Sequence, residues 1–286
     1  MPYPFTTEPL PSTYVNTMLL KGGKNRIING NFEVNQRGYT SGTNLASGTY
    51  GFDRWKSGFT NTALTFTDGV QATTVTISSS GVLQQIVERE NVPADTYTLS
   101  WTGTATGRVY NSGATAPAYA ASPITVSLDG LANVVVEFTA AGGTRTLGLV
   151  QLERGAVPSP FEYRHRGEEL ALCQRYFEKS YALTTVPGTA TDVGLEINSM
   201  TSDAIGQVWY PVSFKVTKRA TPTMAMWTNA GGANQWIADG PGVGTTFAVV
   251  ASFTSEGKTV IYAGISGWPA WTASRLYGHW TASAEL

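Results

Sequence analysis

Apolar and polar residues alternate with a period of two along two long stretches of this chain, in short runs separated by turn-forming residues. This alternation is typical of half-buried antiparallel β-strands, whose successive side chains point to opposite faces of the sheet. In the first stretch the apolar positions are Leu64 and Phe66; Val75 and Ile77; Tyr97, Leu99 and Trp101; Ile124, Val126 and Leu128; and Val134, Val136 and Phe138. Many short strands of this kind predict a β-sandwich of the jelly-roll type.

Turn signals fall between these runs. Asp68-Gly69 and Asp129-Gly130 supply residues that accept the positive φ of a tight hairpin turn, and the serines from Ser78 to Gly81 mark another reversal. We therefore expect hairpins at the two Asp-Gly pairs.

The period of two returns after Tyr181 and predicts a second β-sandwich. Its expected strands carry Val193, Leu195 and Ile197; the long run from Val208 to Val216; and the segments Thr245 to Phe253, Thr259 to Ile265 and Arg275 to Thr281.

Between the two stretches lies FEYRHRGEELALCQRYFEKSY, whose pattern is helical. Leu170, Cys173 and Phe177 share one face, and Gly167 is acceptable as an N-cap, so the pattern predicts a helix over residues 167–180. A helix of this length is marginal alone, and its apolar face must pack on something. Either it caps the open end of one sandwich, or copies from several chains meet around a symmetry axis.

The expected organisation is mainly β, with two jelly-roll-like β-sandwich domains joined by one α-helix. Residues 1–25, with four prolines and a polar run, form an extended attachment arm or linker. Residues 26–163 form the first sandwich, residues 164–181 the connecting helix, and residues 182–286 a distal sandwich.

Composition excludes several classes of protein. The net charge is −1 across 286 residues and the Lys and Arg residues form no basic stripe, so we expect no nucleic-acid partner. Cys173 is the only cysteine, which excludes an intrachain disulfide framework and a Cys-based zinc cluster; we expect it to be a small buried residue. No run of about 18 apolar residues occurs, so we expect no membrane insertion, and no secretory signal pattern opens the chain.

Recognisable catalytic motifs are missing from the sequence. The two histidines, His165 and His279, lie in no metal-binding spacing, and GxSxG, P-loop and GxGxxG patterns are missing. We expect His165 to be a surface residue. A glycan-cleaving enzyme needs only two carboxylates, and the sequence does not show whether any of its carboxylates form such a pair. We predict that the protein is not an enzyme, with a glycan depolymerase as an alternative.

Tryptophan is the positive signal. A sugar ring offers an apolar face and a rim of hydroxyls, so its binding sites combine exposed aromatic rings with amide and carboxylate side chains. Trp236, Trp268 and Trp271 occur near turn residues and are predicted to stack on sugars, with Asn234 and Asp239 as hydroxyl partners. The alternative is that these tryptophans fill a core or a subunit interface.

Glu33 and Glu153 lie near the beginning and the end of the first predicted sandwich. The first and last strands of a jelly roll are neighbours, so these two carboxylates could share a calcium ion with backbone carbonyls. Ordinary surface carboxylates are the alternative. We expect no required cofactor and retain structural calcium as an option.

Several segments resemble tail-fibre or receptor-binding proteins of tailed bacteriophages. They are RIINGNFEVNQRG with GFDRWKSG downstream, the junction VQLERGAVPSPFEYRHRGEELALCQRYFEKSY, the strand and turn PVSFKVTKRATPTM, and the terminal WTASAEL. The resemblance extends over most of residues 26–286, and the junction is its most specific part.

The resemblance implies an N-terminal jelly roll similar to carbohydrate-binding modules, a helix, a distal β-domain and a homotrimer in the virion tail, made in the host cytoplasm. It also implies non-catalytic attachment to bacterial surface polysaccharide or lipopolysaccharide, with residues 1–25 contacting other tail or baseplate proteins. Leu170, Cys173 and Phe177 would then pack near the threefold axis. A structural tail component without glycan binding is the first alternative function.

Overall fold

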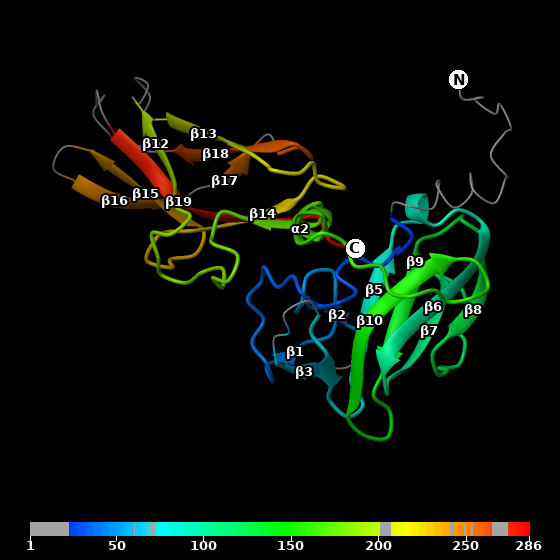
Figure 1. Ribbon diagram of the computed structural model, residues 1–286. Helices are drawn as coiled ribbons and strands as arrows, with labels where there is room; N and C mark the ends of the chain where they lie inside the picture. The colour runs from blue at the N-terminus through cyan, green and yellow to red at the C-terminus, as the bar shows by residue number, and fades with distance from the viewer. Residues whose placement is uncertain are drawn as a thin grey trace, which may run out of the picture.

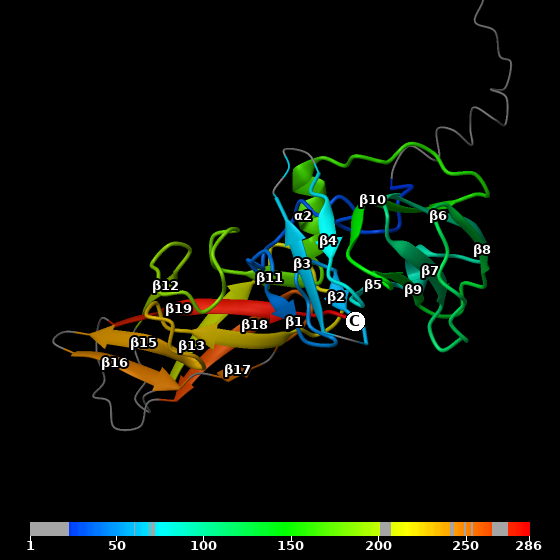
Figure 2. The ribbon, with the colours of Figure 1, turned by 90° about the horizontal axis from the view of Figure 1, so that it is seen from below.

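The computed structural model describes residues 23–59, 61–67, 69, 72–200, 207–240, 243–248, 250–252, 254–264 and 274–286. The described chain is mainly β, as predicted, and its strands form two β-structured units (Figure 1). Figures 1 and 2 both place the α-helix α2 and the C-terminus between these units. None of the helices within the described ranges has the length and apolar character needed to cross a membrane.

Two antiparallel sheets build the first unit, with the strand orders β1-β3-β4-β10-β6-β8 and β2-β5-β9-β7. The six-stranded sheet contains β1 (Asn44–Leu45), β3 (Thr62–Phe66), β4 (Val75–Ile77), β10 (Arg145–Arg154), β6 (Asp95–Gly103) and β8 (Ile124–Leu128). The four-stranded sheet contains β2 (Lys56–Ser57), β5 (Val82–Val87), β9 (Val134–Thr139) and β7 (Thr106–Asn111), and a short 3-10 helix, η1 (Arg89–Asn91), follows β5.

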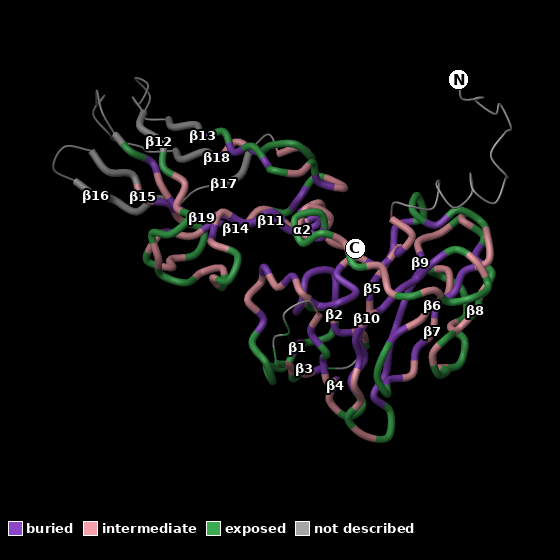
Figure 3. The backbone as a smooth tube through the Cα atoms, in the orientation of Figure 1, coloured by how far each residue is buried: buried purple, intermediate pink, exposed green. Residues whose placement is uncertain are grey.

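One hydrophobic cluster fills the first unit, drawn from the alternate positions that the sequence predicts. Leu64, Ile77, Leu99 and Phe138 are all fully buried in it, together with Trp55. Figure 3 shows the buried backbone concentrated along β5, β9 and β10. Strand β9 is buried at every position, because it lies between β5 and β7 and is covered on both faces. This arrangement is the expected β-sandwich.

The second unit contains a sheet ordered β11-β19-β15-β16, in which β12 and β14 also pair with β19, and a second sheet ordered β13-β18-β17. Its strands are β11 (Phe177–Lys179), β12 (Glu196–Met200), β13 (Gln207–Ser213), β14 (Thr223–Trp227), β15 (Gln235–Gly240), β16 (Val243–Ala248), β17 (Val250–Ser252), β18 (Lys258–Gly264) and β19 (Ser274–Ser283). Its core cluster includes Tyr210, Trp236, Ile261, Leu276 and Trp280.

The helix is shorter than predicted. It spans Arg166–Gln174, and the expected continuation to residue 180 is wrong, because Phe177–Lys179 instead forms β11 and pairs with β19. Its N-cap is His165, whose Nδ1 accepts a hydrogen bond from the Gly167 backbone N–H at 3.2 Å, and not Gly167 itself. Tertiary strand pairing therefore overrides the helical period after the first two and a half turns.

Two further details of the strand prediction differ from the structure. Asp129-Gly130 does not close a hairpin, because β8 pairs with β6 whereas β9 pairs with β5 and β7 in the other sheet. Gly130 does adopt the expected positive φ, but in a connection between sheets. In the second unit, Val193 and Leu195 precede β12, and only Ile197 of that predicted run lies in the strand.

The packing around Trp236 generates a prediction. Gly278 in β19 lies against this fully buried indole, and a Cβ added at Gly278 would approach Trp236 Cδ1 to 2.2 Å. Gly278→Ala is expected to lower the free energy of unfolding by about 1–3 kcal/mol through overpacking. Gly257→Ala is the matched control, since a Cβ there meets nothing within 4 Å. Denaturant titrations of both variants check this, and equal stabilities would contradict the packing.

Candidate functional site

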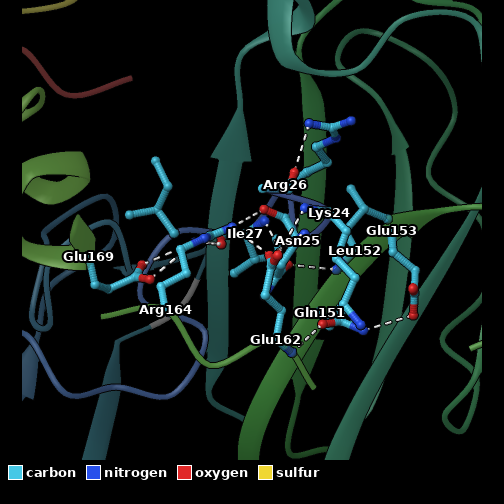
Figure 4. Close-up of polar contacts among 12 residues, drawn as sticks. Lys24, Asn25, Arg26, Ile27, Gln151, Leu152, Glu153, Glu162, Arg164 and Glu169 are labelled. Carbon is cyan, nitrogen blue, oxygen red and sulfur yellow. Dashed lines mark hydrogen bonds and ion pairs between the residues drawn. The ribbon is translucent and has the colours of Figure 1, made fainter. Parts of the chain in front are cut away.

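The opening segment of the described chain runs alongside β10. Arg26 N donates to Leu152 O and Val150 N donates to Gly30 O, both at 2.8 Å. The Asn25 side chain adds a bond from Nδ2 to Val150 O at 3.1 Å (Figure 4). The first and last extended segments of this sandwich are therefore neighbours, as the jelly-roll expectation requires.

Arg164 attaches this opening segment to the helix. Its guanidinium donates to the carbonyl oxygens of Ile27, at 3.0 Å, and Asn25, and it pairs with the Glu169 carboxylate at 3.1 Å (Figure 4). Glu169 also accepts a hydrogen bond from the Asn29 backbone N–H. The first turns of α2 are thus fixed to the first unit by charge-assisted hydrogen bonds.

A cluster of buried charged and amide groups lies where the two units meet. We call Gln36, Arg37, Asp53, Arg54 and Glu285 the junction cluster. Asp53 accepts hydrogen bonds from Gln36 N at 2.6 Å and from Gln36 Nε2 at 2.7 Å. Glu285 pairs with Arg37 at 3.0 Å and with Arg54. The Gln36 amide also donates to Phe177 O at 2.9 Å, so the cluster links the opening loop, β11 and the last residues of the chain.

The C-terminal residues extend this junction. Tyr50 Oη donates to Leu286 O at 2.6 Å, and Lys56 Nζ donates to the same oxygen at 2.8 Å. The Arg54 guanidinium stacks over Tyr176 with its carbon 3.5 Å from the ring centroid, and Arg37 lies over Phe177 at 3.9 Å. Cation–π contacts and ion pairs therefore act on the same two arginines.

A second buried ion pair lies at the C-terminal end of the helix. Lys218 Nζ is 2.5 Å from Glu178 Oε2, and both side chains are fully buried. Lys218 also donates to the carbonyl oxygens of Gln174 and Val216, each at 2.7 Å, and Glu178 accepts from Lys215 N at 2.9 Å. All three Lys218 donor positions are thereby used, which is the condition under which a buried charge is tolerated.

Burial at the junction shifts ionisation in identifiable directions. Burial raises the pKa of Asp53 to about 6, although Arg37 and the two Gln36 hydrogen bonds oppose the shift. Burial also raises the pKa of the Cys173 thiol well above its usual value, and Asp53 and Glu169 act in the same direction. Cys173 is a buried, protonated packing residue, as the sequence predicts.

Beside the junction is a cleft of about 930 Å³, lined by the opening loop, β3, the N-terminal end of α2 and the segment at Leu183 and Thr184. Aromatic rings contribute much of its lining: Phe32, Tyr39 and Phe52 are buried, and Phe66 is half-buried. Tyr163, at 57% exposure, stands among its lining residues. Volume and aromatic lining are in the range of small-molecule binding sites.

Polar groups complete the cleft. Burial raises the pKa of Glu33, while a hydrogen bond from Asn31 opposes that shift. Glu33 Oε1 and Gln36 Oε1 are both buried and accept no hydrogen bond from any described residue. Exposed Arg166 and His165 contribute donor groups nearby. The cleft thus offers hydrogen-bond acceptors and donors beside its aromatic lining residues.

The structure corrects part of the predicted sugar site. Trp236 has no exposed surface, and its indole N–H donates to His279 O at 3.0 Å inside the second core, so its expected role as an exposed stacking ring is wrong. Asn234 is exposed in a tight turn with φ of 58°, which keeps it available to a ligand. Asp239 lies in β15, but its side chain is not among those described. Trp268 and Trp271 lie outside the described residues.

The predicted threefold interface is corrected in a similar way. Cys173 has no exposed surface and Phe177 only 6%, because both pack within the chain and Phe177 belongs to β11. These two side chains leave no face for other copies, so the interface assigned to them is wrong. Leu170 is half-buried and lines the cleft. The apolar face of the helix serves the junction, in keeping with the capping alternative.

Glu33 and Glu153 have different neighbours, which argues against a shared calcium ion. Glu153 accepts from Gln151 Nε2 at 2.8 Å and from Ser159 N at 2.7 Å (Figure 4), whereas Glu33 lies near Asn31 and α2. Across the described ranges, no group of three or more His, Cys, Asp or Glu residues is arranged to hold a metal ion.

Comparisons with known proteins give weak structural similarity alone. No protein-family model and no curated protein matches this sequence. One similar solved structure is the tailspike protein 4 enzymatically active domain of bacteriophage CBA120, with a TM-score of 0.28 and 16% identity over 46% of this chain and 22% of that one. Another is discoidin II of Dictyostelium discoideum, with a TM-score of 0.24 and 10% identity over 85% of this chain and 88% of that one. The tandem CBM22 domains of Paenibacillus barcinonensis Xyn10C have a TM-score of 0.25 and 10% identity over 86% of this chain and 96% of that one.

Asp53→Asn is expected to change how stability depends on pH. With an ordinary pKa of 3.8 and a folded value of about 6, the folded chain binds more protons than the unfolded chain between these values. The free energy of unfolding should therefore fall as pH rises from about 4 to about 6, by about 3 kcal/mol for this group. Asp53→Asn should remove that fall, as measured by urea titrations at several pH values. The control is Asp129→Asn, which changes an exposed aspartate; a variant at Asp53 that kept the full slope would contradict the assignment.

Lys218→Met is expected to destabilise the chain by about 3–5 kcal/mol, because it leaves the Glu178 carboxylate buried without its cation. Arg89→Met, which breaks the exposed ion pair with Glu90, is the matched control and should cost less than about 1 kcal/mol. Thermal and urea unfolding measure both, and a double variant Lys218→Met with Glu178→Leu should recover part of the loss. If Lys218→Met and Arg89→Met lowered the free energy of unfolding equally, the Lys218–Glu178 pair would be solvated and the prediction would be wrong.

Proposed function

We propose that this chain is a receptor-binding tail-fibre protein of a tailed bacteriophage, which attaches the virion to host surface glycan by non-catalytic binding. One observation supports it: the segments that resemble that family supply the partners of two buried ionic contacts near α2 and β11. Arg37 from RIINGNFEVNQRG and Arg54 from GFDRWKSG both pair with Glu285 from WTASAEL. Lys218 from PVSFKVTKRATPTM pairs with Glu178 from the long junction segment.

The Arg37–Glu285 and Arg54–Glu285 pairs attach the last residues of the second β unit to the first unit, and the Lys218–Glu178 pair fixes β11 within the second unit. A fibre protein needs such an attachment, because a distal binding unit is effective only when its base holds it in a defined direction. Rigid placement also lowers the entropy lost on binding. In a homotrimer, three weak sites on one rigid tip would gain avidity through effective concentration.

The described polar groups favour binding over catalysis. His279 uses both ring nitrogens, toward Ser180 Oγ at 3.1 Å and Thr191 O at 2.9 Å, and stacks on Tyr181. Burial lowers the pKa of His279, so it is a neutral structural residue near pH 7. Glu196 accepts from Tyr210 Oη at 2.8 Å, and Asp192 accepts from Asn229. These groups are committed to the fold.

Within this proposal, glycan recognition by the second unit falls to Trp268, Trp271, Asn234 and Asp239, with residues 1–25 attaching the protein to other tail or baseplate proteins. A structural tail component without glycan binding is the alternative, and a glycan depolymerase is the second.

The test uses the full chain on an array of bacterial capsule and O-antigen polysaccharides. Wild-type protein should bind at least one glycan. The double variant Trp268→Ala, Trp271→Ala should weaken that binding at least tenfold, because stacking of a sugar depends on the face of the aromatic ring. Phe59→Ala is the matched control, because Phe59 is 70% exposed in the first unit. Light scattering should give a mass near three times the 30.5 kDa chain.

Three results would contradict parts of this proposal. If the chain binds no glycan but phage particles fail to assemble without it, the structural alternative is favoured. New reducing ends released from a bound polysaccharide would defeat the non-catalytic claim. A stable monomer would remove the avidity argument and leave a two-unit binding module.

A further inference from the structure

The cleft beside the junction has an acceptor whose position is dictated by the fold. Gln36 is 1% exposed, and its Nε2 donates to both Asp53 Oδ1 and Phe177 O. These two bonds fix the orientation of the amide, so that Oε1 is left as the acceptor atom. Oε1 accepts no hydrogen bond from the described residues, although Gln36 lines the cleft. A buried acceptor without a donor costs stability, which a ligand or water can recover.

Glu33 provides a second acceptor in the same cleft. Its Oε1 is also buried and accepts no hydrogen bond from the residues that the structure describes. Among the lining residues, Arg164 is neutralised by Glu169, whereas Arg166 is exposed and does not carry a described ion pair. The lining therefore contains the Glu33 carboxylate, which bonds to Asn31 but has no described donor at Oε1, and the exposed Arg166 guanidinium, whose charge acts on that carboxylate.

This pairing of groups selects among ligand classes. A cation would satisfy Glu33 but meet Arg166, and an anion would face the reverse conflict. A hydroxyl group donates and accepts at once, so a hydroxyl-rich neutral ligand satisfies both sides. The half-buried Phe66 ring and the exposed Tyr163 ring add apolar surface suited to the C–H faces of a sugar.

We propose that this cleft is a second saccharide-binding site, which takes a short neutral segment of a surface glycan. Glu33 and Gln36 accept hydrogen bonds from sugar hydroxyls, and Arg166 donates to them. Phe66 and Tyr163 contact the apolar faces of the rings. The proposal rests on the proposed function for the class of ligand, but it assigns binding to residues distinct from the loops of the second unit.

The position of the cleft gives this site a further property. Leu183 and Thr184 follow β11 of the second unit and line the same cleft as the opening loop of the first unit. A saccharide bound here contacts residues from both sides of the junction, and it should stabilise their attachment by mass action.

The experiment uses the full chain and an array of bacterial capsule and O-antigen oligosaccharides, followed by calorimetric titration with the strongest binder. Glu33→Gln removes the carboxylate at constant volume, and Thr184→Trp fills the exposed rim of the cleft. Each should weaken binding at least tenfold. Glu33→Gln removes one charge-assisted hydrogen bond, and the indole of Thr184→Trp occupies the space of one sugar ring. Thr184 is exposed and Glu33 is half-buried, so thermal melts are used to verify that both variants fold.

Matched controls are Glu90→Gln, an exposed carboxylate in η1, and Thr189→Trp, an exposed threonine in the same connecting segment that does not line the cleft. Both should bind as the wild type does. Wild-type binding that survives Glu33→Gln and Thr184→Trp unchanged would overturn this inference and leave the proposed function intact. A wild-type chain that binds no oligosaccharide of the array would overturn both.

Discussion

The two β units depend on the burial of ionic groups at their junction. Taking Asp53, Arg54 and Glu285 out of water costs several kcal/mol per ion, and this cost is offset only when every charge has a close partner. The partners come from distant parts of the sequence: Gln36 from the opening loop, Tyr176 after the helix and Glu285 from the penultimate position. The interaction is therefore satisfied in one arrangement of the two units, which makes the junction specific as well as stable.

This constraint decides the end of the helix. Extending α2 through Phe177 would keep that residue from pairing with Ser283 and would remove the carbonyl that the Gln36 amide contacts. The chain instead leaves the helical conformation after Gln174, and β11 joins the sheet of the second unit. The helix is a short connector. Its buried face, which includes Glu169 and Cys173, packs against the first unit and the junction.

The sequence predicts the strands of the first unit well, because a period of two follows directly from one buried and one exposed face. It predicts less where tertiary context decides. Asp129-Gly130 has the right turn residues, yet which sheet β9 joins depends on long-range pairing that no local signal reports. Trp236 is close in sequence to turn residues, which indicates an exposed ring. The pairing of β15 with β19 instead directs its side chain into the core. The cleft was missed because its residues come from segments over 100 positions apart; the motifs RIINGNFEVNQRG and FEYRHRG were its only signal.

The junction cluster takes its charged and amide side chains from RIINGNFEVNQRG, GFDRWKSG and WTASAEL, three of the segments that resemble tail-fibre proteins. Arg37, Arg54 and Glu285 are held by one another within the chain. Under the proposed function, ligand recognition falls to side chains outside the junction cluster, such as Glu33, Tyr163 and Arg166 at the cleft and Asn234 in the second unit. On that proposal, substitutions at these open side chains would change the binding surface without disturbing the ion pairs that join the two units.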